Sequence, residues 1–189
     1  MERLQPFRFD EEEGVFWLLD QRRLPQEEVW VPVRTPREMA QAIRDMVVRG
    51  APAIGVSAAF GMVLAHMAGE DLEEADRLLR QSRPTAVNLF HALDRMRPHF
   101  GDLKGSLEEA KALWREVEET ERAISQHGAK VLKGQVLTHC NTGPLATGGG
   151  GGRLWGPSSR PTARGGCATS GWTRPGPTSK GPGSPPLSS

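Results

Sequence analysis

The chain is 189 residues long and poor in several residue types, and each scarcity excludes a class of protein. Its two cysteines, Cys140 and Cys167, are too few for a fold held by a framework of disulfide bridges. The longest apolar stretch, 51–67, is broken by proline, glycine, serine and histidine, so we expect a buried helix there and no membrane partner. The first residues are charged and show no secretory signal, so we expect a cytoplasmic protein.

The last 42 residues, 148–189, contain no Asp, Glu, Val, Ile, Phe or Met. Twenty-six of them are Gly, Pro or Ser, a composition that cannot bury enough apolar surface to offset the entropy of ordering the chain. We therefore predict a disordered tail. This tail has a formal charge of +5 and the rest of the chain −4. Because the tail has no Tyr or Phe to stack on bases, we expect no nucleic-acid partner.

Before the tail, the spacing of apolar residues predicts an α+β fold that is mostly helical, with a small antiparallel sheet. Two apolar runs, 15–19 and 29–33, are separated by charged residues and predict antiparallel strands. Thr35 and Glu38, with Pro36 between them, are typical of a helix N-terminus with a capping box. Further helices are predicted over 51–66, 71–81 and 85–98, and from a second capping box at Ser106 and Glu109 to a stop at Gly134.

Apolar spacing also predicts which side chains face inward on two of these helices. They are Met39, Ile43, Met46 and Val47 on the first, and Leu107, Ala110, Leu113, Trp114, Val117 and Ile124 on the last. The charges from Glu116 to Glu121 are interpreted as a solvated face. Residues 135–140 predict a short strand, and 141–143 the turn that leaves it.

Residues 138–143 (Thr-His-Cys-Asn-Thr-Gly) place a thiol at the end of this strand, just before a glycine turn. In open α/β sheets ligands bind at this position, and nearby backbone amides lower the pKa of a thiol. Cys140 is therefore a candidate reactive or transition-state-stabilising residue. The alternative is a small buried residue that ends a strand, which is the commoner case for a lone cysteine. His139 is predicted to face the other way along the strand.

Two arginines stand where predicted helices begin. Arg49 opens the run 49–55 (Arg-Gly-Ala-Pro-Ala-Ile-Gly), and Arg83 opens 83–89 (Arg-Pro-Thr-Ala-Val-Asn-Leu). A guanidinium beside exposed helix amides suits a phosphate, although a tight helix–helix turn and a solvated linker arginine explain the two runs equally well. With Cys140 they describe a site for a phosphorylated small molecule. The histidines lack metal-ligand spacing, so we expect no metal.

In this order, the three runs resemble the methylthioribose-1-phosphate isomerase family, a relative of the regulatory subunits of a guanine-nucleotide-exchanging translation initiation factor. The resemblance covers nearly all of 1–147. It implies a mainly helical N-terminal domain over 1–130 and, over 131–147, the first strand of a Rossmann-like α/β domain. It also implies a homodimer that converts the aldose methylthioribose 1-phosphate into the ketose methylthioribulose 1-phosphate in methionine salvage, without a cofactor.

The resemblance further implies roles for individual residues. Arg49, Gly50, Ala51 and Arg83 would contact the substrate, and Cys140 would be the catalytic cysteine that stabilises the transition state. Two alternatives stay open. One is a non-catalytic binding module like the initiation factor's regulatory subunits. The other is a ribose-1,5-bisphosphate isomerase-like enzyme, because these residues do not define the substituent at carbon 5 of the sugar.

The tail departs from the family's pattern. The family's catalytic aspartate and a substrate-binding glutamine have no match in 148–189. DNA encoding Ser170 to Pro185 can be chosen so that another frame gives Trp-Val-Asp-Glu-Thr-Arg-Pro-Tyr-Leu-Gln-Gly-Ala-Arg-Leu-Thr, the family's pattern with its glutamine. DNA encoding residues 153–155 can likewise be chosen so that the remaining frame gives the family's Gly-Tyr-Gly. We therefore expect a truncated chain, with an out-of-frame tail after more than one insertion or deletion, that is inactive as written.

Overall fold

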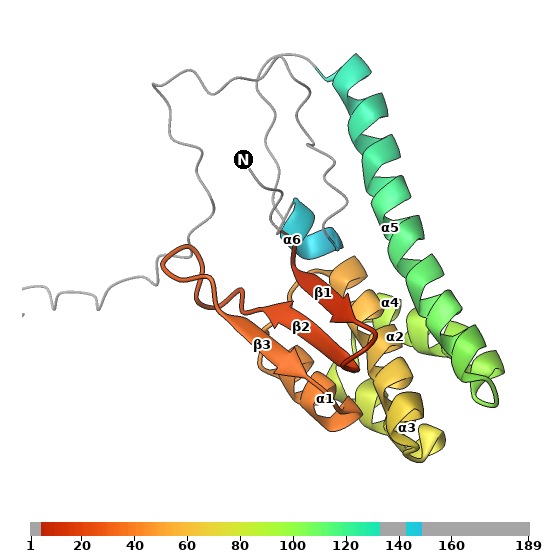
Figure 1. The fold of residues 1–189 in the computed structure, drawn as a ribbon. Helices are drawn as coiled ribbons and strands as arrows, with labels where there is room; N and C mark the ends of the chain where they lie inside the picture. Colours follow the sequence, from red (N-terminus) through yellow and green to blue (C-terminus); the bar gives the residue numbers. More distant parts are fainter. Residues whose placement is uncertain (1–4, 133–142, 149–189) are drawn as a thin grey trace, which may run out of the picture. The chain divides into compact units, whose positions relative to one another are not determined.

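The computed structural model describes residues 5–132 and 143–148. Within them lie the strands β1 (Phe7–Asp10), β2 (Val15–Leu19) and β3 (Trp30–Val33) and the helices α1 (Pro36–Arg44), α2 (Ala51–Ala68), α3 (Leu72–Ser82), α4 (Val87–Met96), η1 (Arg97–His99), α5 (Leu103–Val131) and α6 (Pro144–Thr147) (Figure 1). The predicted mostly helical fold with a small antiparallel sheet is confirmed. The predicted strand at 135–140 and the tail lie outside the described residues.

The three strands form one antiparallel sheet in the order β1-β2-β3. The predicted pairing of β2 with β3 is confirmed, and β1 is an additional strand that pairs Phe7 with Leu18 across the ladder. The four residues of β1 alternate aromatic and charged side chains, a pattern too short to predict a strand on its own. Phe7 and Phe16 are fully buried, so this face of the sheet packs on the helices.

Helix α2 is the centre of the core, with 13 of its 18 residues buried. Its Phe60 ring stacks on Phe16 of the sheet at 4.7 Å between centroids and meets Trp114 of α5 edge-on at 5.8 Å. Among the described helices, α2 alone is long and apolar enough to cross a membrane. Its burial by the sheet and the other helices is that of a core helix, as the broken apolar run predicts.

The observed helix starts test the predicted capping boxes. The capping box of Thr35 and Glu38 is present at the start of α1. The second capping box is wrong, because α5 begins earlier, at Leu103, behind the cap Asp102. The Ser106 hydroxyl lies inside that helix and donates instead to the His99 carbonyl at 3.0 Å.

Two residues predicted to face inward are exposed. Met46 is 47% exposed because α1 ends at Arg44 and the backbone of Met46 turns to a φ of 58°. Ile124 is 48% exposed because it lies in the part of α5 after Leu113, where few side chains are covered and Ser125 is the one buried residue. Apolar spacing therefore predicts the face of a helix more reliably than the point where its neighbours end.

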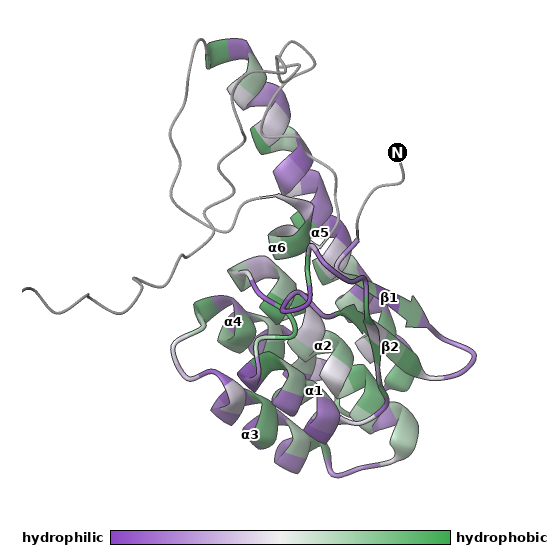
Figure 2. Ribbon diagram, turned by 90° about the vertical axis from the view of Figure 1, so that its left-hand side faces the viewer, coloured by the Kyte–Doolittle hydropathy of each residue, from purple (hydrophilic) through white to green (hydrophobic). Residues whose placement is uncertain are grey.

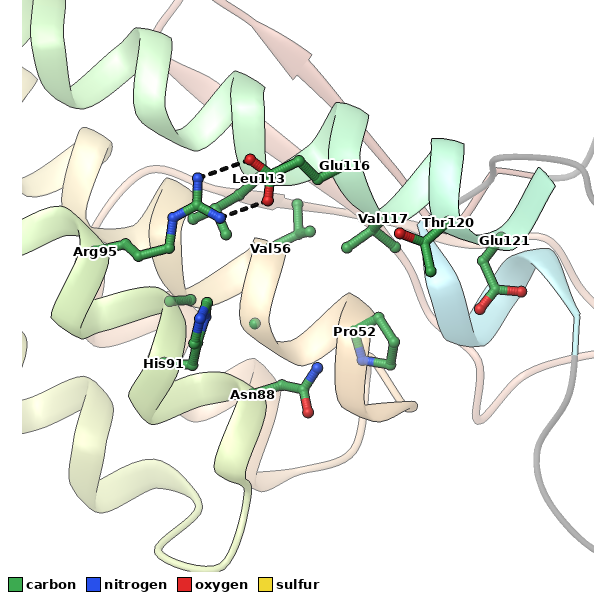
Figure 3. A pocket seen from close by; sticks show the side chains of 12 residues that line it. Pro52, Val56, Asn88, His91, Arg95, Leu113, Glu116, Val117, Thr120 and Glu121 are labelled. Carbon is green, nitrogen blue, oxygen red and sulfur yellow. Dashed lines mark hydrogen bonds and ion pairs between the residues drawn. The ribbon is translucent and has the colours of Figure 1, made fainter. Parts of the chain in front are cut away.

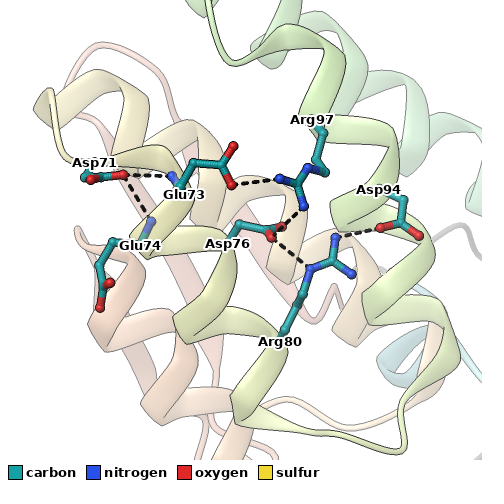
Figure 4. A network of polar contacts seen from close by, with 7 residues as sticks. All are labelled: Asp71, Glu73, Glu74, Asp76, Arg80, Asp94 and Arg97. Atoms are coloured by element: carbon teal, nitrogen blue, oxygen red, sulfur yellow. Dashed lines mark hydrogen bonds and ion pairs between the residues drawn. The ribbon is translucent and has the colours of Figure 1, made fainter.

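An ion-pair network joins α3 to α4 and η1 (Figure 4). Arg80 of α3 donates to the buried carboxylate of Asp76 at 2.8 Å and to Asp94 of α4 at 2.6 Å. Arg97 reaches back to Glu73 at 2.7 Å. The hydrogen bond with Asp76 raises the pKa of Arg80, which keeps its charge. The network fixes the two helices that flank the predicted site segment 83–86.

Candidate functional site

The start of α2 is in close contact with a segment from much later in the sequence. Gly50 is the N-cap of α2 and has a φ of 101°, which favours glycine. A Cβ added at Gly50 would lie 2.3 Å from the carbonyl oxygen of Ala146 and 2.5 Å from its Cα. Glycine is therefore required at position 50 for two reasons. Its backbone angle is unfavourable for other residues, and α6 occupies the space that a side chain would need. The contact brings the run 49–55 next to the residues that follow the run 138–143.

Two side-chain hydrogen bonds hold α6 in this position. Gln21, in the loop between β2 and β3, donates from Nε2 to the Leu145 carbonyl at 2.8 Å. Trp114 of α5 donates from Nε1 to the Gly148 carbonyl at 2.9 Å. Ala146 is also buried, with 3% of its surface exposed. Both donors come from parts of the chain remote in sequence, so α6 is a tertiary element and not a local turn.

The start of α4 lies against the start of α2. A Cβ added at Gly55 would lie 2.9 Å from the Asn88 carbonyl oxygen, so the first turns of both helices touch there. Figure 3 shows Pro52 and Asn88 together at one end of the helix pair. The two helix N-termini therefore share one region, and their free amides and dipoles favour an anion there.

The predicted substrate-contacting residues lie at the start of α2 and in the turn that leads from α3 into α4. Arg49 is exposed, and its Nε donates weakly to the Met46 carbonyl at 3.4 Å. Ala51 is the exposed first residue of α2. Arg83 is half-buried, ends α3 and accepts the Ala86 amide at 3.0 Å through its own carbonyl. Its guanidinium has no hydrogen bond or ion pair with the rest of the described chain.

Other predicted features of the site fall outside these contacts. Cys140 and His139 lie outside the described residues. The helix predicted over 85–98 begins at Val87, and its cap Ala86 makes no side-chain hydrogen bond. Within 5–132 and 143–148, no three His, Cys, Asp or Glu side chains are grouped to hold a metal ion.

A pocket of about 250 Å³ opens between α2, α4 and α5, beside the two helix starts (Figure 3). Its lining comes from all three helices: Pro52, Gly55, Val56, Asn88, His91, Ala92, Arg95, Leu113, Glu116, Val117, Thr120 and Glu121. The lining residues from α2 are apolar, and the charged groups all come from α4 and α5. A pocket of this kind accepts a small molecule with an apolar part.

Ion pairs shape the charge of this pocket. Arg95 donates to Glu109 at 2.6 Å and to Glu116 at 2.5 and 2.9 Å. The hydrogen bond from Arg95 lowers the pKa of Glu116, whereas burial raises the pKa of Glu121. The predicted solvated face is confirmed at Glu116, whose side chain is 57% exposed although it pairs with Arg95, whereas Glu121 is half-buried. Charge spacing along one helix could not identify this partner on another helix.

The residues that fix α6 were missed by sequence reasoning. Gln21 stands in a charged loop, where nothing in the sequence distinguishes it from Gln26. Trp114 was predicted to face inward, but its N–H donor had no predicted partner. Asn88 was inside the run 83–89, so the run itself was the only available signal for it.

Comparisons with known proteins place these features in a family context. A family model described as the initiation factor 2 subunit family matches residues 47–147. A methylthioribose-1-phosphate isomerase of Thermus thermophilus is 87% identical over 149 residues, which are 79% of this chain and 45% of the relative. The Pseudomonas aeruginosa isomerase of the same name is 50% identical over 160 residues, covering 72% of this chain and 44% of that one.

Solved structures agree with the fold. The 5-methylthioribose 1-phosphate isomerase from Pyrococcus horikoshii has a TM-score of 0.71 and 34% identity, covering 78% of this chain and 46% of its own. The translation initiation factor eIF-2B subunit delta from A. fulgidus has a TM-score of 0.64 and 33% identity, covering 78% and 48%. The chain thus spans less than half the length of each of these relatives.

Proposed function

Because the chain belongs to the initiation factor 2 subunit family, we propose that it carries the N-terminal share of an aldose–ketose isomerase active site. The proposed substrate is S-methyl-5-thioribose 1-phosphate and the product S-methyl-5-thioribulose 1-phosphate, a step of methionine salvage. The observation that carries the proposal is the 87% identity over 149 residues to a methylthioribose-1-phosphate isomerase. The joined starts of α2 and α4 support it, because the amides and dipoles of helix N-termini attract anions.

In the proposed site, Arg49 and Arg83 bind the substrate with the backbone of Gly50 and Ala51. The amides at the start of α2 point at the anion, and the exposed guanidinium of Arg49 is free to turn toward it. Neutralising the phosphate at one end of the sugar fixes the position of its reacting carbons.

The isomerisation opens the sugar ring and transfers hydrogen from carbon 2 to carbon 1. The bond between carbon 1 and the ring oxygen breaks, and that oxygen stays on carbon 4 as a hydroxyl. The hydroxyl on carbon 2 loses a proton as carbon 2 becomes the ketone, which balances the proton gained by the ring oxygen, so no external oxidant is needed. Cys140 is the proposed catalytic residue, which stabilises the transition state of this transfer. The contact of Ala146 with Gly50 supports this role only through the sequence, because Ala146 closely follows the run 138–143.

The division of the chain is part of the proposal: an N-terminal helical domain over 1–130, the first strand of a Rossmann-like domain over 131–147, and an out-of-frame tail over 148–189. The chain as written is then inactive, because the family's aspartate and glutamine have no match among residues 148–189. Sequencing the gene around codon 148 tests this directly. We expect to find insertions or deletions whose correction restores the family's pattern. An unbroken reading frame ending at Ser189 would reject the tail proposal.

The frame-corrected protein tests the activity. We expect it to isomerise methylthioribose 1-phosphate, and we expect Cys140→Ala and Arg83→Ala each to lower kcat/KM by about 100-fold or more, as removal of one transition-state donor does. Arg37→Ala, at an exposed arginine of α1, is the matched control and leaves turnover unchanged. Full turnover in a variant that lacks both Cys140 and Arg83 would contradict the assignment.

Two other functions are separated by the same assay. The similarity to the eIF-2B delta subunit favours a non-catalytic binding module, which would bind a sugar phosphate or a nucleotide without turnover. A ribose-1,5-bisphosphate isomerase-like enzyme would turn over the bisphosphate in preference to the methylthio compound. We also propose a cytoplasmic homodimer without a cofactor, and light scattering of the frame-corrected protein measures its oligomeric state.

A further inference from the structure

Helix α6 is too short to hold its own position. It has four residues, Pro144–Thr147, and a single helical turn is unstable in isolation because its nucleation cost is not recovered. Its placement against Gly50 must therefore come from tertiary contacts. Its last two residues are buried, and Gly148 packs so tightly that an added Cβ would lie 3.2 Å from the Phe7 ring.

The Gln21 side chain is the polar contact nearest the middle of α6. It belongs to a loop whose backbone is held by contacts that do not involve α6. The Gln21 amide donates to the Val47 carbonyl at 3.0 Å, next to the run 49–55. The neighbouring Asp20 is 3% exposed, and its carboxylate accepts from the Arg22 guanidinium at 2.7 and 2.8 Å. That hydrogen bond lowers the pKa of Asp20, so the pair stays ionised and the loop stays closed.

Gln21 therefore connects two segments of the candidate site. Its backbone is tied to Val47, three residues before Gly50, and its side chain is tied to Leu145, next to Ala146. Ala146 in turn occupies the only space in which a Gly50 side chain could lie. A glycine is otherwise free to turn, so this packing selects the backbone angle of Gly50 and with it the direction of the Ala51 amide.

We propose that Gln21 is a positioning residue for the anion site at the start of α2. Its amide holds α6 against Gly50, and α6 keeps the Gly50–Ala51 backbone in the conformation that receives phosphate. Trp114 acts in the same way from the other end of α6 through Gly148. This inference rests on the proposed function, because it assigns the held backbone to phosphate binding.

The test uses the full chain of 189 residues with inorganic phosphate as the probe. Amide hydrogen exchange at Ala146 and Gly148, whose N–H groups bond to Gly143 and Pro144, reports the docking of α6. The chemical shifts of the Ala51 and Ala53 amides report phosphate at α2. We expect Gln21→Ala to lower the protection of both α6 amides about tenfold, as loss of one net hydrogen bond does, and to weaken phosphate binding several-fold.

Two controls separate positioning from general stability. Gln26→Ala removes an exposed glutamine of the same loop and should leave both readouts unchanged. Gln21→Glu should behave like Gln21→Ala at neutral pH, because a carboxylate cannot donate to the Leu145 carbonyl. Below about pH 4 its protonated carboxyl can donate, and protection should return to that of the unaltered chain at the same pH. Trp114→Phe keeps an aromatic ring, although a smaller one, and removes the N–H, so it tests the second anchor if Gln21→Ala fails to fold.

The outcomes are distinguishable. Unchanged α6 protection in Gln21→Ala, or equal losses in Gln26→Ala, overturns the inference. Phosphate bound equally well by Gln21→Ala and by the unaltered chain also overturns it, while leaving the proposed function intact. If phosphate shifts no α2 amide in the unaltered chain, the proposed phosphate site is wrong and the positioning role falls with it, even where α6 protection still depends on Gln21.

Discussion

Helices α2 and α5 touch each other in the core but are held in place by different means. Helix α2 buries 13 of its 18 residues, whereas α5 buries four of its 29. Figure 2 shows α2 as pale to hydrophobic and α5 as a mixture of hydrophilic and hydrophobic residues. Packing on every side fixes α2, while α5 relies on one apolar stripe and on ion pairs.

This difference bears on where a site can be built. A helix packed on all sides has an N-terminus that cannot shift, so the amides before Ile54 keep a constant direction. Helix α5 contributes charges to the pocket from a more exposed surface, through Glu116 and Glu121. The rigid helix therefore suits recognition of a phosphate, and the exposed one suits adjustable electrostatics.

The largest expected effect comes from shortening a core side chain of α2. Phe60→Ala removes a fully buried ring that packs on Phe16 and Trp114, and should lower the free energy of unfolding by about 3–5 kcal/mol. Ile124→Ala on the exposed part of α5 should change it by less than about 0.5 kcal/mol. Urea unfolding measures both, and similar values would abolish the distinction between the two helices.

A second comparison contrasts the two ends of α2. Gly50 and Gly69 both have a positive φ, 101° and 67°, but a Cβ at Gly69 meets nothing within 4 Å. We expect Gly69→Ala to cost about 1 kcal/mol from backbone strain alone. Gly50→Ala must also displace Ala146 and should cost about 3 kcal/mol, with loss of protection in α6. Equal costs in denaturant unfolding would mean that α6 does not press on Gly50.

The smallest effect sharpens the account of α5 and depends on pH. Arg95 lowers the folded-state pKa of Glu116, so its contribution to stability is present above the unfolded pKa near 4.5 and is lost as the pH falls through the folded value. Burial raises the pKa of Glu121, so its contribution is present at low pH and is lost as the pH rises through the folded value.

The two glutamine variants should therefore differ in sign. At pH 7, Glu116→Gln should be less stable than the unaltered chain, by about 0.5 kcal/mol because Glu116 is largely exposed, and Glu121→Gln should be more stable. Both differences should shrink as the pH approaches 3.5. Unfolding midpoints measured from pH 3.5 to 7 check this, and slopes of the same sign would contradict the assignment of opposite causes.

Sequence reasoning succeeded where the decisive interactions are local. The capping box at Thr35 predicted the start of α1, and the small-residue run from Ala51 predicted α2, because both patterns lie within a few residues. It failed where a contact or cap outside the local pattern determines the structure. The start of α5 depends on Asp102 and not on the equally plausible Ser106, and the short β1 is a strand because β2 pairs with it.

The candidate site divides in the same way. The residue types at Arg49, Gly50 and Arg83 could be read as phosphate-binding from their positions at helix starts. The contact of Gly50 with Ala146 could not be predicted, because it joins two segments far apart in the sequence. Their relative position depends on hydrogen bonds from Gln21 and Trp114. Donors aimed at a backbone carbonyl leave no pattern in a single sequence.

The tight approach at Gly50 has an evolutionary consequence. A methyl group added there would strike the main chain of Ala146, which cannot change rotamer to make room as a side chain could. Homologues that keep both segments should therefore be invariant at this position, and a lineage that replaced the glycine would have to rebuild the docked turn as well. A survey of natural variants can score that pairing without any purified protein.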